Sequence, residues 1–184
     1  MKRIIDLFLS ISALLILSPL FIVISMIIYL SDRGTVFYTQ KRVGFDCQEF
    51  SLYKFRTMCP NADKIGSYST STNDYRITRV GKFLRRSSLD ELPQLVNVMI
   101  GDMSLVGPRP NVPMQRSLYC ETDWNKRHSI KPGITGLAQA TLRSSATEKQ
   151  RLMLDLEYVD RMNILFDLKI IFMTIKQVLF KGGN

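Results

Sequence analysis

An uninterrupted apolar run occupies residues 7–30, which are 24 consecutive positions without a charged side chain. As one straight helix, this run would be about 36 Å long, which is enough to cross a bilayer. A signal peptide fits less well, because the run is too long and no small-residue cleavage site follows it. The pattern therefore predicts a helix embedded in a membrane.

Ser18 and Pro19 stand at the middle of this run. Proline removes a backbone hydrogen bond and kinks a helix, which leaves two halves of about 18 Å, each roughly half a bilayer deep. Lys2, Arg3 and Arg33 place positive charge at both ends, so no direction of crossing is favoured. We expect a broken, re-entrant helix with both ends in the cytoplasm, in which Ser18 satisfies carbonyls freed by Pro19. A kinked helix that crosses the whole bilayer is the alternative.

The pattern changes after this helix. Residues 35–44 and 50–58 are short runs rich in β-branched and aromatic residues, and Gly44, Phe45 and Asp46 separate them. This arrangement predicts a β-hairpin. Residues 59–78 are polar and rich in turn-forming residues, which is typical of a long surface loop.

Helical patterns follow in two places. Residues 79–101 are expected to form two short helices that meet near Ser87 and Ser88, and helical periodicity resumes at Thr147. Between these helical regions, the glycine-proline segments 107–113 and 131–136 predict turns without regular structure.

The apolar residues of the last helical segment recur every three or four positions, and Lys169 and Lys176 lie elsewhere on the helix. This helix is therefore amphipathic. Packing against a core is one interpretation, and lying at a membrane interface is the other. The residues of the apolar stripe are Ile164, Leu168, Ile171, Ile175 and Val178.

These elements indicate the class of fold. The length of 184 residues suits one domain with its own core. We expect a mostly helical α+β protein that is monotopic in the membrane, with a re-entrant helix-break-helix, a short β-hairpin and amphipathic interfacial helices. Residues 1–32 would form the membrane helix, and residues 33–184 would form a domain at the cytoplasmic face.

Composition narrows the class of partner. The net charge of +9 favours an anionic partner, such as a phosphorylated ligand or a membrane surface. A nucleic acid is not expected, because aromatic residues do not alternate with the basic ones and the apolar run would have no role. Cys47, Cys59 and Cys120 are odd in number, which argues against a disulfide framework. With His128 as the single histidine, any bound metal should be a hard cation held by oxygen.

Two adjacent carboxylates, Asp90 and Glu91, follow a pair of arginines in the segment RRSSLDELPQL. One interpretation is a capping box, in which Ser88 and Glu91 satisfy backbone N–H groups at a helix start, supported by Pro93. The other interpretation is a working site. An ionised aspartate at a helix start can act as a nucleophile, and the glutamate beside it can hold Mg²⁺.

Basic residues at turns and element ends favour the working site. Arginine pairs bidentately with phosphate oxygens, so several such residues near two carboxylates suggest a diphosphate substrate. The candidates for phosphate binding are Lys54, Arg56, Arg85, Arg109 and Arg143.

The segments YKFRTM, LRRSSLDELPQL, GDMSLVGPRP and KPGITGLAQ occur in the order found in one family. On these motifs and the helix broken at Ser18 and Pro19, the chain resembles the bacterial sugar transferases, which are monotopic phosphoglycosyl transferases. The resemblance covers nearly the whole chain, which looks like the minimal catalytic form of the family.

The resemblance implies a two-step reaction. Asp90 would attack the sugar-bearing phosphate of a UDP-sugar and release UMP, and the phosphosugar would then pass from Asp90 to undecaprenyl phosphate. Such a product starts the assembly of an O-antigen, capsule, exopolysaccharide or glycoprotein glycan. Glu91 matches the Mg²⁺-associated carboxylate, so Mg²⁺ is the expected cofactor. The basic residues that match positions around the phosphates are Arg85, Arg109 and Arg143, with Arg56 and Lys54 in the YKFRTM motif.

The resemblance also implies a setting. We expect the bacterial inner membrane, an active site on the cytoplasmic face, contact with membrane lipids, and no nucleic acid; a homodimer is left open. N-acetylated or deoxyamino UDP-sugars are favoured, with plain hexoses as the alternative. Many relatives have Asn-Gly where this chain has Thr141-Leu142 before Arg143, which changes the turn conformations available there.

Other classes of function predict different behaviour. A non-catalytic, basic, membrane-associated binding protein would use the acidic pair only as a helix cap and would tolerate Asp90→Asn. A CDP-alcohol transferase would carry spaced aspartates within several membrane spans, whereas one hydrophobic segment is present here.

Overall fold

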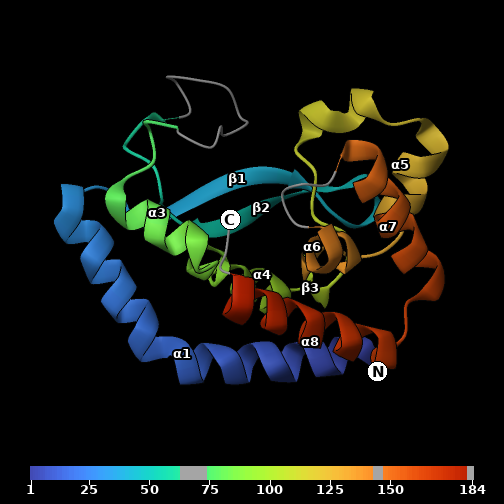
Figure 1. Ribbon diagram of the computed structural model, residues 1–184, viewed down its shortest axis with the longest axis horizontal. Helices are drawn as coiled ribbons and strands as arrows, with labels where there is room; N and C mark the ends of the chain where they lie inside the picture. Colours follow the sequence, from blue (N-terminus) through green and yellow to red (C-terminus); the bar gives the residue numbers. More distant parts are fainter. Residues whose placement is uncertain (63–73, 143–146, 182–184) are drawn as a thin grey trace.

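The computed structural model describes residues 1–62, 74–142 and 147–181, with side chains described as far as residue 178. Within these residues the fold mixes many helices with two small sheets, in agreement with the expected α+β class (Figure 1). The elements, with η marking a 3₁₀ helix, are α1 (Lys2–Asp32), β1 (Phe37–Val43), η1 (Phe45–Cys47), β2 (Glu49–Phe55), α3 (Arg79–Arg86), η2 (Leu89–Glu91), α4 (Gln94–Ile100), β3 (Ser104–Val106), η3 (Pro113–Leu118), α5 (Glu121–His128), β4 (Gly133–Thr135), α6 (Leu137–Leu142), α7 (Glu148–Arg161) and α8 (Ile164–Lys181).

Helix α1 runs through Pro19 as one element and is bent about midway along its length (Figure 1). Pro19 cannot donate to the carbonyl of Leu15, four residues earlier. The Ser18 hydroxyl donates to that same carbonyl, with an Oγ–O distance of 2.8 Å. The role expected of Ser18 is therefore confirmed, and the expected break is a bend within one continuous helix, since the hydroxyl replaces the missing donor.

Both ends of α1 contact the rest of the chain. Near the first turn, Lys2 Nζ lies 2.5 Å from Asp167 Oδ2 of α8. Toward the other end, Ile24 and Ile28 are buried in one cluster with residues of β2 and α3. Many other apolar side chains of α1 are exposed, including Ile4, Phe8, Leu15, Ile16, Ile22 and Leu30. Helix α1 is long and apolar enough to cross a membrane, and only 11% of its most apolar 18-residue window is buried.

Strands β1 and β2 form the predicted antiparallel hairpin, with Phe37 opposite Phe55 and Val43 opposite Glu49. Phe50 and Leu52 of β2 pack in one buried cluster with Val98 and Met103, so the hairpin is anchored to the region around α4. Most of the surface loop predicted at residues 59–78 lies outside the described residues.

The two short helices predicted in residues 79–101 are present as α3 and α4. The prediction that residues 131–136 hold no regular structure is wrong, because β4 pairs in parallel with β3. The two chain segments approach closely here: a Cβ on Gly133 would lie 2.1 Å from the backbone nitrogen of Gly107. Glycine at both positions allows this contact, which places the segment after β3 directly against the β4 region.

Helix α8 is apolar on more than one side, and packing against a core accounts for only part of its predicted apolar stripe. Ile170 is fully buried, whereas Leu168 and Ile175 of the predicted stripe are about half exposed. Leu165 and Phe172 are exposed as well, with 79% and 69% of their surface accessible. One side of α8 therefore packs on the core, while an apolar side faces outward. In Figure 1, α8 runs beside the first half of α1, and both helices line the pocket around Lys2 and Asp167.

Candidate active site

Asp90 and Glu91 lie in η2, the short 3₁₀ helix between α3 and α4. The capping-box interpretation of Ser88 and Glu91 is wrong. Ser88 adopts a left-handed conformation with φ of 57°, and its side chain makes no capping hydrogen bond. An N-cap side chain reaches the next turn from extended backbone, which Ser88 does not have. The Glu91 side chain points elsewhere, to basic groups from two other elements.

Glu91 joins two cations from distant parts of the chain. Its Oε1 accepts a hydrogen bond from Lys54 Nζ of β2 at 2.7 Å and another from Arg109 Nη2, after β3, at 3.0 Å. Burial alone would raise the pKa of Glu91, but the charges and hydrogen bonds of Lys54 and Arg109 lower it to about 2. Glu91 is therefore a fixed anion that holds two basic side chains together.

Asp90 has a different environment. Its surface is 8% exposed, and its carboxylate accepts no hydrogen bond from the residues that the structure describes. Burial raises the pKa of Asp90, and Lys54, Arg85 and Arg109 oppose this rise without cancelling it. Adjacent carboxylates whose pKa values are pushed apart are typical of sites where the two groups have different roles.

Of the remaining predicted site residues, only some lie near Asp90 and Glu91. Arg85 Nε donates to Thr57 Oγ1 at 2.9 Å, and its charge acts on Asp90. Arg56 forms an ion pair with Asp32 at the end of α1, so its partner lies in α1 and not in the carboxylate pair. Arg143 lies outside the described residues. Phosphate binding by these arginines, and by Lys54 and Arg109, stays a prediction.

A pocket opens beside Glu91, and it contains residues that the sequence analysis missed. Arg42 of β1 and Gln94 of α4 line it together with Lys54, Glu91 and Arg109. In the sequence, Arg42 is one of several basic residues after an apolar run. Arg42 reaches the pocket only when the hairpin is folded against α4. Its position on a predicted strand was therefore the only signal of this role in the sequence.

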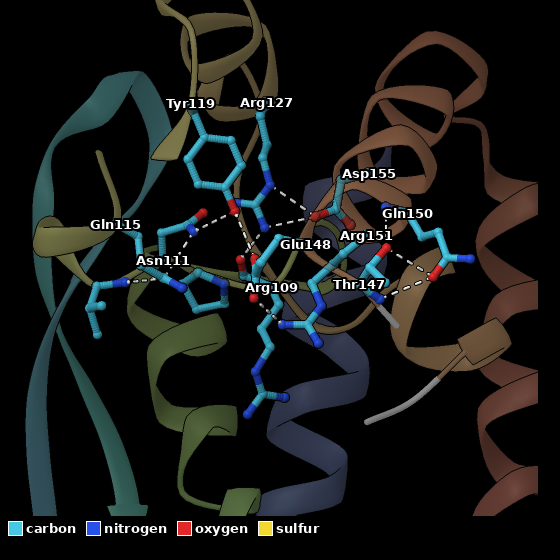
Figure 2. Close-up of polar contacts among 12 residues, drawn as sticks. Arg109, Asn111, Gln115, Tyr119, Arg127, Thr147, Glu148, Gln150, Arg151 and Asp155 are labelled. Carbon is cyan, nitrogen blue, oxygen red and sulfur yellow. Dashed lines mark hydrogen bonds and ion pairs between the residues drawn. The ribbon is translucent and has the colours of Figure 1, made fainter. Parts of the chain in front are cut away.

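The loop that carries Arg109 is held by a donor at each of its carbonyls. The carbonyls of residues 108–111 accept hydrogen bonds, in order, from Gly133 N at 2.9 Å, Arg127 Nη2 at 2.7 Å, Arg42 Nη1 at 3.0 Å and Val43 N at 2.9 Å. Figure 2 shows Arg127 and Asp155 beside the Arg109 backbone, with the Arg109 side chain extending away from them. Arg127, which lies 18 positions from Arg109, was not among the predicted site residues.

Comparison with known proteins identifies the family of this chain. The model of a family described as bacterial sugar transferase matches residues 1–181. This chain belongs to the bacterial sugar transferase family.

Named relatives within the sugar transferase family align along nearly the whole chain. An undecaprenyl-phosphate glucose phosphotransferase of Komagataeibacter xylinus is 43% identical over 97% of the chain and 36% of its own length. Exopolysaccharide production protein PSS of Rhizobium leguminosarum bv. phaseoli is 41% identical over 99% of the chain and 96% of its own length. A UDP-glucose:undecaprenyl-phosphate glucose-1-phosphate transferase of Escherichia coli (strain K12) is 40% identical over 99% of the chain and 40% of its own length.

The chain thus spans well under half of two of these relatives and almost all of the third. Membership of the sugar transferase family, together with the exposed apolar surface of α1, indicates association with a bacterial membrane.

The carboxylate pair can be tested for its fit to the magnesium ion expected of sugar transferases. Among the described residues, no group of three or more His, Cys, Asp and Glu side chains could hold a metal by itself. Asp90 and Glu91 offer carboxylate oxygens, and both hydrogen bonds that Glu91 accepts from described side chains fall on Oε1, which leaves Oε2 open to a ligand. Because Mg²⁺ commonly binds one or two carboxylates together with substrate phosphates, the pair fits an ion shared with a diphosphate.

Proposed function

We propose that this chain transfers a sugar-1-phosphate from a UDP-sugar to undecaprenyl phosphate, through a covalent phosphosugar on Asp90. The observation that supports this proposal most directly is the difference in environment between Asp90 and Glu91. Asp90 is buried, has a raised pKa and accepts no hydrogen bond from the described residues, while Glu91 is held between Lys54 and Arg109. A carboxylate that is not tied up in hydrogen bonds but faces cations is suited to attack phosphorus.

In the first step, an Asp90 oxygen attacks the phosphorus that carries the sugar. The bond from that phosphorus to the oxygen bridging the two phosphates breaks, and the bridging oxygen leaves with its electron pair as part of UMP. Lys54, Arg85 and Arg109 supply positive charge around the transferring group. Positioning and electrostatic stabilisation are the main contributions that a protein makes to phosphoryl transfer.

In the second step, an oxygen of undecaprenyl phosphate attacks the same phosphorus. The bond between phosphorus and Asp90 breaks, which restores the carboxylate and leaves the sugar on a polyprenyl diphosphate. Dividing one transfer into two displacements lets the donor and the acceptor react in turn with the same aspartate.

We assign Glu91 as the residue that would hold Mg²⁺ together with the substrate phosphates, where the ion would supply charge neutralisation. The contribution of the chain itself is to keep Glu91 ionised. Its pKa of about 2 means that it offers an anion at any physiological pH. This assignment rests on the donor atoms and on the open Glu91 Oε2.

The contacts of α1 support a re-entrant arrangement with the active site on the cytoplasmic side, where UDP-sugars are found. Lys2 pairs with Asp167, and Asp32 at the opposite end pairs with Arg56. Both partners belong to the same folded body, so a helix that crossed the bilayer would have to leave one of these ion pairs. A bent helix that enters and returns keeps both, and the outward apolar side of α8 would rest at the same interface.

The experiment is a panel of UDP-sugars, including UDP-glucose and N-acetylated UDP-hexoses, incubated with the purified chain, undecaprenyl phosphate and Mg²⁺. Release of UMP with at least one donor, and a phosphosugar adduct on Asp90 found by mass analysis before acceptor is added, would support the proposal. Turnover without any adduct at Asp90 would refute the covalent step. The rival, non-catalytic interpretation depended on Ser88 and Glu91 forming a helix cap, which the structure does not contain.

A further inference from the structure

The loop 108–111 contains two prolines, which have no backbone N–H to hold the loop from within. Its shape is instead imposed from outside, since its four consecutive carbonyls accept hydrogen bonds from four separate donors. Two donors are backbone N–H groups, and two are the side chains of Arg42 and Arg127. The carbonyl held by Arg127 is that of Arg109, the residue whose guanidinium contacts Glu91.

Arg127 is itself fixed by a buried partner. Its Nε and Nη2 lie 2.9 Å and 2.7 Å from Asp155 Oδ2 of α7, and the two side chains are 2% and 1% exposed. The same Nη2 group also donates a hydrogen bond to the Arg109 carbonyl at 2.7 Å. Asp155, Arg127 and the Arg109 backbone thus form one chain of contacts, visible in Figure 2.

A buried ion pair is a poor means of stabilising a fold, because the cost of removing two charges from water offsets their attraction. Its value lies in fixing one geometry. Helices α5 and α7 already have a second link, an exposed ion pair between Lys126 and Asp160 at 2.7 Å, which does not reach the loop. Arg127 differs from Lys126 in reaching the backbone of a residue at the candidate active site.

We propose that Arg127, oriented by Asp155, is a positioning residue that sets where the Arg109 guanidinium meets Glu91 and the substrate phosphate. The inference rests on the proposed function. Arg127 touches no reacting atom, and it acts through the Arg109 backbone. A displacement of the loop would move the Arg109 side chain away from the developing charge, and errors of about 1 Å at such sites can cost on the order of 100-fold in rate.

The first test is a double-mutant cycle with Arg127→Lys and Arg109→Ala. Lysine keeps the charge opposite Asp155, but one ammonium group cannot reproduce the fork that holds both Asp155 and the carbonyl. In the native background, we expect kcat for UMP release to fall about 10- to 100-fold with a smaller change in KM. In the Arg109→Ala background, the same substitution should cost less than about threefold, because the residue it positions is gone.

The matched control is Lys126→Gln, which removes the exposed ion pair between the same two helices. We expect its kcat to stay within about twofold of that of the native chain. Equal, additive losses from Arg127→Lys in both backgrounds would mean that Arg127 only supports the fold, and would overturn the proposal.

A second readout does not need turnover. Hydrogen exchange of the full chain should become faster at Gly107 and Gly133 in Arg127→Lys. The Gly133 N–H bonds to Pro108 of the loop, and the Gly107 N–H, which directly precedes the loop, bonds to Thr135 of β4. Exchange in α4 and in the Lys126→Gln control should be unchanged. Unchanged exchange at both glycines would overturn the positioning role whether or not any UDP-sugar is turned over. Absence of UMP release by the native chain would instead refute the proposed function.

Discussion

Arg109 Nη2 lies 3.0 Å from Glu91 Oε1, and the same oxygen accepts a hydrogen bond from Lys54 Nζ. One carboxylate oxygen therefore ties the hairpin strand β2, the short helix η2 and the loop after β3 into a single site. Asp90, the neighbour of Glu91, stays free of hydrogen bonds within the described part of the chain. This division of roles between adjacent carboxylates leads to the first two predictions.

Asp90→Asn should abolish the proposed reaction. The amide is nearly the same size but a far weaker nucleophile, so we expect UMP release to fall by about 1,000-fold or more. The melting temperature should not fall, because burial of Asp90 penalises its charged form and no described residue donates a hydrogen bond to it. Asp160→Asn, on an exposed residue, is the control and should keep full activity. Native turnover by Asp90→Asn would contradict the mechanism.

Glu91→Gln should weaken the binding of magnesium. Chelation should stop UMP release by the native chain, and added Mg²⁺ should restore it. Since glutamine offers one neutral oxygen in place of a carboxylate, we expect the Mg²⁺ concentration for half-maximal activity to rise about 10-fold or more. Titrating Mg²⁺ at saturating UDP-sugar measures this shift. An identical Mg²⁺ dependence in both proteins would rule out Glu91 as a ligand.

Arg56→Gln tests which of two roles this residue has. The structure pairs Arg56, which is 8% exposed, with Asp32 at the end of α1. Loss of this largely buried pair should lower stability by about 2 kcal/mol and leave KM for the UDP-sugar within about threefold. Asp32→Asn should behave in the same way. A rise in KM of about 10-fold without loss of stability would instead support the phosphate-binding role predicted from the sequence.

Joint replacement of Ser18 and Pro19 by alanine should straighten α1, because an alanine in place of the proline restores the missing backbone donor to Leu15. In the native chain we expect a tag at the N-terminus to be accessible only from the cytoplasm. In the double variant, a fraction of the tags should be found on the other side. Ser25→Ala, in the same helix but away from the bend, is the control. A native tag outside the cytoplasm would favour the crossing helix.

Acid should destabilise the chain through His128. This side chain is 4% exposed; burial lowers its pKa from 6.5 to about 4, and the positive charges of Arg127 and Arg116 add to this effect. Its Nδ1 lies 2.7 Å from the Trp124 carbonyl, and its Nε2 has no hydrogen-bond partner among the described residues. Because the folded chain binds this proton less readily than the unfolded chain, stability should fall as the pH drops below 6.5 and level off below about 4.

The size of this loss should be on the order of 3 kcal/mol at its full extent. Thermal unfolding between about pH 7 and pH 5 measures its onset. His128→Asn keeps a donor near the Trp124 carbonyl but does not titrate, so its melting temperature should depend less on pH over the same range. Equal pH dependence in both proteins would assign the acid sensitivity to other groups.

Several features were accessible from the sequence because they depend on neighbouring residues. The apolar run around Ser18 and Pro19 predicted a long apolar helix interrupted at its middle, where the structure has a bend, and short runs of β-branched and aromatic residues predicted the β1–β2 hairpin. The acidic pair and the basic residues near turns indicated a cluster of opposite charges, which the structure has at Glu91, Lys54 and Arg109. Local pattern was insufficient where a segment is very short: β3 and β4 have three residues each, too few to show a period.

Sequence by itself also determined that Asp90 and Glu91 share a turn and that cations are available to them. Only the tertiary structure decided that Lys54, 37 positions away, and Arg109, 18 positions away, meet on Glu91 and leave Asp90 open. The tertiary structure also decided that Arg127 donates a hydrogen bond to the Arg109 carbonyl and that Leu168 of α8 is about half exposed. The reason is physical: periodicity reflects local backbone geometry, whereas burial, pKa and hydrogen-bond partners depend on which distant segments pack together.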